Sequence, residues 1–362
     1  MNIPMSRPES SFNPLLTSAE SLLAQPRTIL IRSTNWIGDA IMTTPAVRTI
    51  RENFPQATIS MLAWPWVADV FAASPHIDEI LLYNKNGEHA GLPGMARLTR
   101  MLRERRFECA ILLQNAFEAA LIAFGAAIPV RAGYTTDGRG LLLTHGVRLR
   151  AAIKNKHQVY YYQQLLQGLG LRPGANELFL RLPEESRCWA QQQVRPASGP
   201  LIGLNPGGTY GPAKRWPAEK FARLAGRLHT MFGATLAVLG TSADGATAQV
   251  IKSAAPKGVL DFTGRTSLTQ AMALISRCDA FVTNDSGLMH VGAALDIPLV
   301  AIFGSTNPKT TGPFSRKACV VRKEIPCSPC LQSHCPTDFR CMEEIGVDEV
   351  MRVVERILVK NN

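Results

Sequence analysis

Short apolar runs that alternate with longer amphipathic segments are the feature that most constrains the fold of this chain. Four such runs occur in the first half, at Ile29–Arg32, Thr58–Leu62, Glu79–Leu82 and Glu108–Leu113. Parallel strands need a crossover connection, usually a helix, so this alternation favours a parallel sheet with helices on both faces. The first half is therefore predicted to be a doubly wound α/β domain.

The same alternation returns in the second half of the chain. Strands are predicted at Leu201–Asn205, Thr235–Leu239, Val259–Phe262, Ala280–Thr283 and Leu299–Phe303. A stretch with the composition of a linker, VRPASGP, precedes them. At roughly 100–200 residues per domain, 362 residues fit two domains. We predict the α/β class, with two doubly wound parallel-sheet domains that face a cleft.

The predicted division of the chain has four parts. Residues 1–26 are rich in Ser, Pro and Asn and are predicted to be a weakly ordered extension. Residues 27–193 and 194–346 are predicted to be the two domains. A last helix is predicted within residues 347–362, at Asp348–Val359.

Charge and hydropathy limit the class of partner. The net charge of +11 favours an anionic partner, which is nucleic acid, a phosphorylated ligand or an acidic membrane surface. The longest nearly continuous apolar stretch, Ala119–Val130, is shorter than the roughly 20 residues of a membrane-spanning helix. The N-terminus lacks a basic start followed by an apolar block, so no secretory signal is predicted and we expect a cytoplasmic protein.

The loops that follow the predicted strands are the candidate functional segments, because ligands of open parallel sheets bind outside the carboxyl ends of the strands. The first loop ends with Gly38 and Asp39, where the next helix begins. A carboxylate there can take a proton from an acceptor hydroxyl as a general base. It can also simply cap the helix, and the residues alone leave both alternatives open.

The loop that follows Asn205 combines glycines with cations. It reads NPGGTYGPAKRWP and contains Gly207, Gly208, Thr209 and Lys214. Backbone N–H groups of such a loop can surround phosphate oxygens, whose charge Lys214 would neutralise. We favour a phosphate site over a solvated turn with incidental charge. The loop does not have the spacing of a Walker A motif.

Two further loops open helices. Asp244 lies in the first of them, where a ribose contact and an ordinary N-cap are both open. In the second, Asp285, Ser286 and Gly287 begin a helix whose N–H groups and dipole favour a phosphate. His290 follows one turn later, and a hydrogen-bonded core residue is the simpler interpretation of a single histidine.

Four cysteines lie close together near the end of the chain. Their spacing is C-x2-C-x4-C-x5-C, and they are Cys327, Cys330, Cys335 and Cys341. Thiolates at short spacing can hold a structural zinc ion. Reduced packing cysteines or a disulfide pair are the alternatives. We leave a structural zinc ion open, without a catalytic role, and expect no cofactor to be required.

Three segments together resemble the heptosyltransferase II enzymes of glycosyltransferase family 9. They are Ile31–Pro45 (IRSTNWIGDAIMTTP), Gly211–Pro217 (GPAKRWP) and Thr283–Leu295 (TNDSGLMHVGAAL). The resemblance implies the GT-B fold, with an N-terminal acceptor domain, a C-terminal donor domain and a last helix that packs back on the N-terminal domain. The N-terminal extension and the cysteine cluster depart from the family pattern.

The resemblance also implies roles for individual residues. Asp39 matches the catalytic base of the family. Contacts with the ADP-sugar donor are implied for Thr209, Lys214, Asp244, Asp285, Ser286, Gly287 and His290. Gly38, Gly207 and Gly208 would shape the loops that carry them.

The implied activity is inverting transfer of heptose from ADP-L-glycero-D-manno-heptose to the first heptose of the lipopolysaccharide inner core. The implied partners are this donor, an anionic lipid A–core acceptor and the inner face of the inner membrane, with no nucleic acid. One alternative is another GT-B transferase, either heptosyltransferase I or an enzyme with a different nucleotide sugar. A basic nucleic-acid-binding protein is a distant alternative, because the cations do not alternate with aromatic residues on one module.

Overall fold

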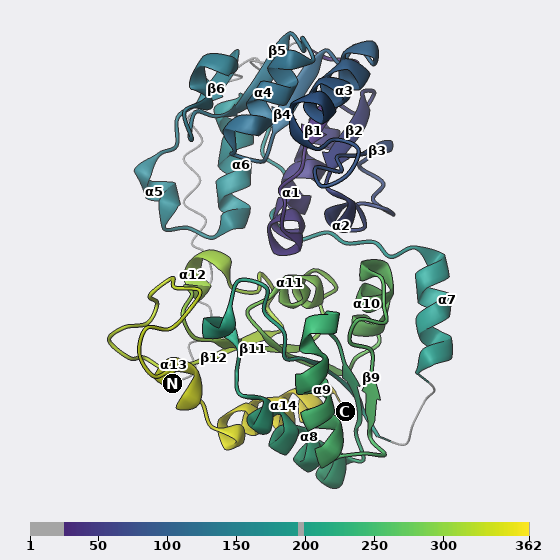
Figure 1. Ribbon diagram of the computed structural model, residues 1–362, viewed down its shortest axis with the longest axis vertical. Coiled ribbons are helices and arrows are strands. Elements are labelled where there is room, and N and C mark those ends of the chain that lie inside the picture. The colour runs from purple at the N-terminus through teal and green to yellow at the C-terminus, as the bar shows by residue number, and fades with distance from the viewer. Residues whose placement is uncertain (1–24, 195–198, 362) are drawn as a thin grey trace. The chain divides into compact units, whose positions relative to one another are not determined.

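The computed structural model describes residues 25–194 and 199–361, so nearly all of the predicted N-terminal extension lies outside the described residues. The chain separates into two units that divide between Arg181 and Leu182 (Figure 1). Helix α7 (Glu184–Gln193) therefore belongs to the C-terminal unit, whereas the sequence predicted a division after residue 193. It packs against α10 (Leu268–Ile275) of that unit.

The N-terminal unit contains a six-stranded parallel sheet with the order β3-β2-β1-β4-β5-β6. Its strands are β1 (Thr28–Arg32), β2 (Thr58–Ala63), β3 (Glu79–Leu82), β4 (Cys109–Leu112), β5 (Val130–Tyr134) and β6 (His145–Val147). The first four confirm the predicted strands. The last two lie at one edge of the sheet and were not predicted, because VRAGY and HGV are short and interrupted by Gly, Arg and His.

Helices cover this sheet. They are α1 (Ile37–Asn53), α2 (Pro65–Ala68), α3 (Gly91–Glu104), α4 (Phe117–Gly125), α5 (Ala151–Lys154) and α6 (Gln158–Gly168), with a 3-10 turn η1 (Arg139–Leu142). Helix α1 packs against α6, and α3 packs against α4 (Figure 1). Leu98 and Leu102, one turn apart on α3, are fully buried in the core that the second pair closes.

The C-terminal unit repeats this architecture, with the strand order β12-β11-β10-β7-β8-β9. Its strands are β7 (Leu201–Asn205), β8 (Thr235–Val238), β9 (Val259–Asp261), β10 (Ala280–Asn284), β11 (Leu299–Phe303) and β12 (Ala318–Arg322). The first five were predicted, and β12 was not. Both sheets therefore follow the doubly wound order 3-2-1-4-5-6, and the prediction of the fold class is confirmed.

The remaining helices of the C-terminal unit are α8 (Ala218–Phe232), α9 (Gly245–Ala254), α11 (Gly287–Ala294), α12 (Pro308–Thr311), α13 (Arg340–Glu343) and α14 (Val347–Asn361), with the 3-10 turns η2 (Pro212–Lys214) and η3 (Ser242–Asp244). Helix α14 packs against α8 and strands β10 to β12. Val350, Val354 and Leu358 recur every four residues on its buried face and join the core of this unit. Helix α14 therefore belongs to the C-terminal unit, and its packing on the N-terminal domain stays a prediction.

The reversal of strand order falls between β1 and β4 in one sheet and between β7 and β10 in the other. Loops leave such a point toward opposite faces of the sheet, which opens a crevice for a ligand. Both positions coincide with loops that the sequence singled out. Within the described residues, no helix is long and apolar enough to cross a membrane.

Candidate functional site

The loops at the carboxyl ends of β7 and β10 are joined by the side chain of Asn205, the last residue of β7. Its amide nitrogen donates to Thr283 Oγ1 (2.9 Å) and to Ser286 Oγ (2.6 Å). All the residues of β7 and β10 are buried, so the polar side chains of Asn205 and Thr283 need hydrogen-bond partners inside the protein. They bind each other. The hydrogen bonds fix the start of α11 against the end of β7.

A second buried amide, that of Asn284, holds the glycine-rich loop. Its nitrogen donates to the carbonyl of Pro206 (2.7 Å), and its oxygen accepts from the backbone N–H of Trp216 (3.1 Å). The Trp216 ring is 2% exposed, and its N–H donates to the carbonyl of Ile345. Both ends of the loop between β7 and α8 are therefore anchored to rigid parts of the unit.

Within this loop, Lys214 forms an ion pair with Asp285. The ammonium nitrogen lies 2.6 Å from the carboxylate, and the two side chains are 15% and 5% exposed. Asp285 also accepts from Thr306 Oγ1 (2.5 Å), and the Lys214 ammonium lies 4.8 Å from the centre of the Tyr210 ring. A lysine held in this way has a fixed position, and its three N–H donors exceed what one carboxylate oxygen takes.

The structure corrects one detail of the predicted phosphate site. The backbone N–H of Asp285 donates to the carbonyl of Ile302 (3.2 Å), so it continues the sheet ladder and is not directed at a ligand. Ser286 is the N-cap of α11, and its hydroxyl accepts from the N–H of Met289 (3.3 Å). The positive end of α11 and the Lys214 ammonium remain the features that suit an anion at this edge.

The other predicted donor contacts occupy different environments. Thr209 is exposed in the loop, and His290 is 4% exposed on α11, as a core histidine would be. Asp244 is 5% exposed, and its carboxylate accepts from both the N–H and the hydroxyl of Thr241 in a capping box. Thr241 is the N-cap of this capping box and Asp244 is its third residue, whereas at the start of α9 the Asp244 side chain makes no cap hydrogen bond. Asp244 also pairs with Arg215 at 3.6 Å.

Close packing explains one of the two adjacent glycines. A Cβ on Gly207 would lie 2.7 Å from the Asp244 carboxylate, and one on Gly240 would lie 2.9 Å from it. These distances are shorter than a carbon–oxygen contact allows, so a Cβ at either place would displace the Asp244 carboxylate from its capping box. Gly208 has no such constraint, because a Cβ there would meet Lys214 Cβ at an ordinary 3.6 Å.

The end of β11 belongs to the same edge of the sheet, and the sequence reasoning missed it. Ser305 is 1% exposed, and its hydroxyl has no hydrogen-bond partner among the described residues. Thr306 follows it and binds Asp285. A Ser-Thr pair one residue beyond the fully buried run Leu299–Phe303 was the available signal.

The segment with the cysteines packs against the glycine-rich loop. This cysteine loop, residues 325–339, accepts a hydrogen bond from Ala213 N–H at the carbonyl of Ser333 (3.1 Å). It accepts another from the Tyr210 hydroxyl at the carbonyl of Leu331 (2.7 Å). Gly211 has a φ of +154°, and a Cβ there would lie 2.2 Å from the Ser333 carbonyl oxygen. The contact therefore requires glycine at position 211.

The structure gives no support to a zinc site in the cysteine cluster. Among residues 25–194 and 199–361, no group of three or more His, Cys, Asp or Glu side chains is arranged to hold a metal ion. Cys341 is 7% exposed in the core of the unit, whereas Cys327 is exposed to solvent. Hydrogen bonds, led by that of Thr337, lower the pKa of the Cys335 thiol.

In the N-terminal unit, Asp39 lies at the reversal point between β1 and β4. It is the third residue of α1, immediately after Gly38, and it is partly exposed. A carboxylate in the first turn interacts favourably with the helix dipole. Burial raises the pKa of Tyr162 on α6, and the negative charge of Asp39 adds to that effect, which places the carboxylate near this tyrosine.

Two buried arginines, which sequence reasoning missed, hold the loops at this edge. Arg32, the last residue of β1, is 2% exposed and donates to Asn35 Oδ1 (2.8 Å). Arg139 is fully buried and donates to Asn115 Oδ1 (2.9 Å) and to the carbonyl of Tyr134 (2.8 Å). Burial lowers the pKa of each guanidinium to about 10. Both remain cations at neutral pH.

Two tryptophans beside this edge are exposed to solvent. Trp36 is 60% exposed and is the N-cap of α1, and Trp66 is 44% exposed on α2. The Trp66 indole N–H donates to the carbonyl of Asn35 (3.1 Å), and its ring packs edge-on against Trp64 at 4.6 Å. Both indoles therefore lie close to the loop that leads into Asp39.

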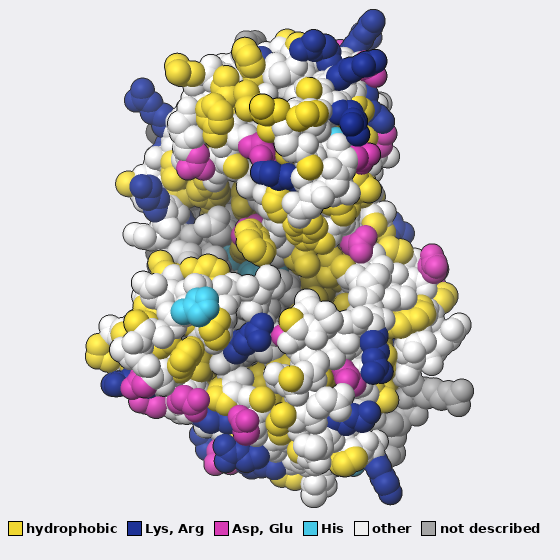
Figure 2. Space-filling view, viewed as in Figure 1, with side chains coloured by type: hydrophobic (Ala, Val, Ile, Leu, Met, Phe, Trp, Pro, Cys, Tyr) yellow, Lys and Arg dark blue, Asp and Glu magenta, His cyan; other side chains and the backbone are white. Residues whose placement is uncertain are grey.

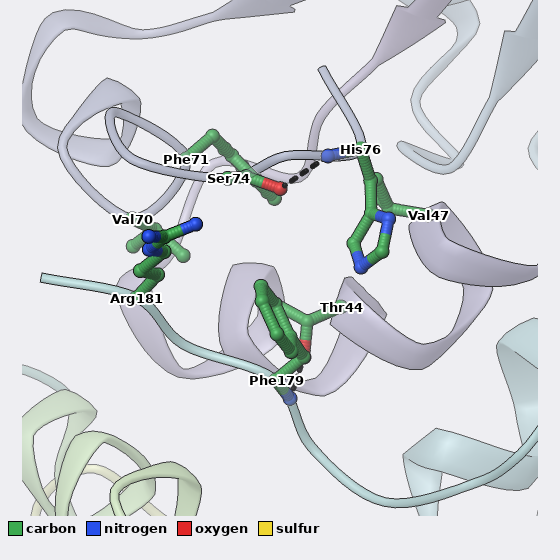
Figure 3. Close-up of a pocket in the computed structure, with 8 residues that line it drawn as sticks. All are labelled: Thr44, Val47, Val70, Phe71, Ser74, His76, Phe179 and Arg181. Atoms are coloured by element: carbon green, nitrogen blue, oxygen red, sulfur yellow. Dashed lines mark hydrogen bonds between the residues drawn. The ribbon is translucent and has the colours of Figure 1, made fainter. Parts of the chain in front are cut away.

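Figure 3 shows a separate, partly open pocket in the same unit. It is lined by Thr44, Val47, Val70, Phe71, Ser74, His76, Phe179 and Arg181. Burial lowers the pKa of His76, and the nearby Arg48 charge lowers it further. Its Nε2 is buried and has no hydrogen-bond partner among the described residues. The lining mixes apolar side chains with the polar side chains of Thr44, Ser74, His76 and Arg181.

Two doubly wound sheets, one with a cationic loop and the other with a carboxylate at its reversal point, are the architecture of the GT-B fold class. The chain belongs to glycosyltransferase family 9 (heptosyltransferase), whose family model matches residues 95–339. The predicted resemblance is therefore confirmed, and so is the class of enzyme.

Individual relatives agree with this assignment. A Salmonella typhimurium lipopolysaccharide heptosyltransferase 2 is 34% identical over 315 residues, which cover 81% of this chain and 87% of the relative. The solved structure of Escherichia coli ADP-heptose lps heptosyltransferase II has a TM-score of 0.78 and 30% identity, and covers 92% of this chain and 99% of that one. A Pseudomonas aeruginosa lipopolysaccharide heptosyltransferase 1 is 26% identical, covering 85% and 87%.

Proposed function

We propose that this protein transfers heptose from ADP-heptose to the inner core of lipopolysaccharide, as the second heptosyltransferase of that core. The observation that carries the proposal is the Lys214 ammonium, held by Asp285 where the strand order of the C-terminal sheet reverses. A fixed cation at this place suits the pyrophosphate of a nucleotide sugar. The names of the 34%-identical relatives supply the sugar and the acceptor.

The donor would bind through its diphosphate. Lys214 would use its remaining N–H donors for phosphate oxygens while Asp285 keeps one of them. Ser286 and Gly287 would contribute the positive end of α11, and Thr209 an exposed hydroxyl from the glycine-rich loop. Asp244 and His290 would line the donor side through packing, in keeping with their burial.

The acceptor hydroxyl would be activated by Asp39. As the hydroxyl oxygen attacks the anomeric carbon, Asp39 accepts its proton, and the bond from that carbon to the pyrophosphate oxygen breaks with its electron pair. ADP leaves, and the single displacement inverts the anomeric centre, by analogy with inverting glycosidases. Lys214 would stabilise the negative charge that grows on the leaving group. These residues need no cofactor for the reaction.

The assignment to the second transfer rests on similarity. Relatives named heptosyltransferase 2 are 26–34% identical, and three of them reach 33–34%, against 26% for the relative named heptosyltransferase 1. The acceptor would then be an inner core that already carries one heptose. The alternative is another GT-B transferase that uses a different nucleotide sugar, because neither the loop contacts nor the fold identifies the nucleotide base of the donor.

We further propose a cytoplasmic enzyme that touches the inner face of the inner membrane. The net charge of +11 suits an anionic lipid-linked acceptor and an anionic lipid surface. On the face of the N-terminal unit seen in Figure 2, apolar side chains lie among Lys and Arg side chains. On α3, Leu92 is 83% exposed and Arg97 and Arg100 are also exposed.

The direct test is a transfer reaction with the full-length protein. We expect ADP-heptose and a monoheptosylated core acceptor to give a product heavier by one heptose, detected by mass spectrometry. ADP should compete with the donor, and UDP should not. Transfer from a UDP-sugar instead, or transfer to an acceptor without any heptose, would replace the proposal by one of its alternatives.

A further inference from the structure

We propose that Trp36 and Trp66 form an aromatic platform on which a pyranose ring of the acceptor stacks beside Asp39. This inference rests on the proposed function, because it assigns an acceptor contact to a sugar transferase. The ligand class is a pyranose whose C–H face packs on an indole and whose hydroxyls stay in water or bind nearby polar groups. Neither tryptophan was singled out by the sequence patterns.

The first argument is the place of Trp36 at the start of α1. N-cap positions favour Ser, Thr, Asp or Asn, whose side chains accept a hydrogen bond from the helix, and Trp36 makes no side-chain cap. Its indole is also 60% exposed, so it does not serve the core. A large aromatic side chain that neither caps the helix nor packs inside the unit is suited to binding a ligand.

The second argument is position relative to the carboxylate. Trp36 and Asp39 are the N-cap and N3 residues of α1, and in a capping box the side chains at these two positions each reach the backbone of the other residue. Trp36 has the extended backbone of an N-cap (φ −113°, ψ 140°), and its carbonyl accepts from Ala40 N–H at 2.9 Å. A sugar stacked on the Trp36 indole would therefore lie at the edge of the sheet where Asp39 can reach one of its hydroxyls.

The third argument is that the second indole is held in place before any ligand arrives. Trp66 donates to the carbonyl of Asn35, the residue next to Trp36, at 3.1 Å. Trp64 packs edge-on against it at 4.6 Å, and Arg32 fixes the side chain of Asn35 at 2.8 Å. A ring that is already oriented loses little conformational entropy when it binds. Yet its exposed fraction remains 44%.

Aromatic faces also bind lipid, so the experiment must separate the sugar from the acyl chains. We would measure steady-state kinetics with a deacylated acceptor oligosaccharide and, in parallel, with the complete lipid-linked acceptor. The central variant is Trp36→Ser, because serine is a good N-cap and should keep or raise the melting temperature. Trp66→Ala tests the second ring. Phe124→Ala, which removes a 51%-exposed aromatic ring on α4, is the matched control.

With the deacylated acceptor, we expect Trp36→Ser to raise the acceptor KM about tenfold. This factor corresponds to the binding free energy that one aromatic contact contributes. The donor KM should stay within about twofold, since Trp36 lies on the other unit. Trp36→Phe should restore the acceptor KM to within about threefold, because a smaller aromatic face still stacks. Trp66→Ala should act in the same direction, and Phe124→Ala should match the wild type.

Two results would overturn the platform. One is an unchanged acceptor KM in both tryptophan variants, and the other is a defect seen only with the lipid-linked acceptor, which would assign the indoles to lipid. Absence of transfer by the wild-type protein would count against the proposed function instead. In that case calorimetric titration of the deacylated acceptor into the wild type and Trp36→Ser would still test the platform, with unchanged affinity as the contrary outcome.

Discussion

The ammonium group of Lys214 and the carboxylate of Asp285 are 2.6 Å apart, and both side chains are largely buried. The pair joins the glycine-rich loop to the start of α11, and Thr306 binds the same carboxylate. A buried ion pair of this kind is strongly disturbed when one partner is removed alone, because the other charge is left uncompensated. The ion pair therefore holds the Lys214 ammonium in one position.

Lys214→Ala should lower kcat/KM for the donor by about a hundredfold or more, because the variant loses the cation that stabilises the leaving pyrophosphate. The measurement is steady-state transfer across the donor concentration range. The acceptor KM provides the internal control and should change little. Donor kinetics equal to those of the wild type would remove Lys214 from the proposed phosphate site.

Asp39→Asn should reduce transfer by about 10²–10⁴-fold, the contribution that general base catalysis makes. The substitution keeps the size of the side chain, and the affinity for ADP should stay near that of the wild type, because Asp39 lies in the other unit from Lys214. Calorimetric titration of ADP checks the second point. Substantial turnover by the variant would mean that Asp39 only stabilises the start of α1.

Gly207→Ala should destabilise the C-terminal unit by about 1–3 kcal/mol, the range for forcing extra atoms into a packed site. The new Cβ would lie 2.7 Å from the Asp244 carboxylate, which Thr241 holds in a capping box. Urea unfolding measures the change. Gly245→Ala is the matched control, because a Cβ there meets nothing within 4 Å and alanine suits the helix α9 that begins at this residue. Equal stabilities of the two variants would contradict the packing argument.

His76 should make stability depend on pH. Its pKa in the folded protein lies below the usual 6.5 because of burial and the charges of Arg48 and Arg51, against which Glu52 acts. The unfolded chain therefore binds more protons as pH falls below about 6.5, and the free energy of unfolding should decrease there. Urea unfolding at pH 7.5 and pH 5.5 should show a smaller decrease for His76→Leu than for the wild type. An equal decrease would mean that other titratable groups determine how the free energy of unfolding depends on pH.

The fold could be predicted from the sequence because its central strands are apolar and separated by regular helices. LIGLN, AFVTN and LVAIF are buried along their whole length, and apolar residues make up most of each strand. The edge strands β6 and β12 are only partly covered, and their mixed sequences gave no such signal. The division of the chain was also misplaced, because α7 joins the C-terminal unit through packing against α10.

Part of the candidate site could be predicted because its loops follow apolar strands that the sequence reveals. Glycines, Lys214 and Asp285 stand out after apolar strands, so their loops could be found without a structure. Their partners could not, because Asn205 and Thr306 are common residue types whose importance comes from distant segments that the fold brings together. Arg32 and Arg139 gave no signal either, since arginine is usually exposed and burial of a charge cannot be read from local sequence.

The hydrogen bond from Ala213 to the carbonyl of Ser333 has a practical consequence for anyone who reshapes donor selectivity. The glycine-rich loop cannot be transplanted from a homologous enzyme by itself, since its outer wall is contributed by chain more than a hundred residues away. The glycine-rich loop and the cysteine loop should therefore be exchanged together.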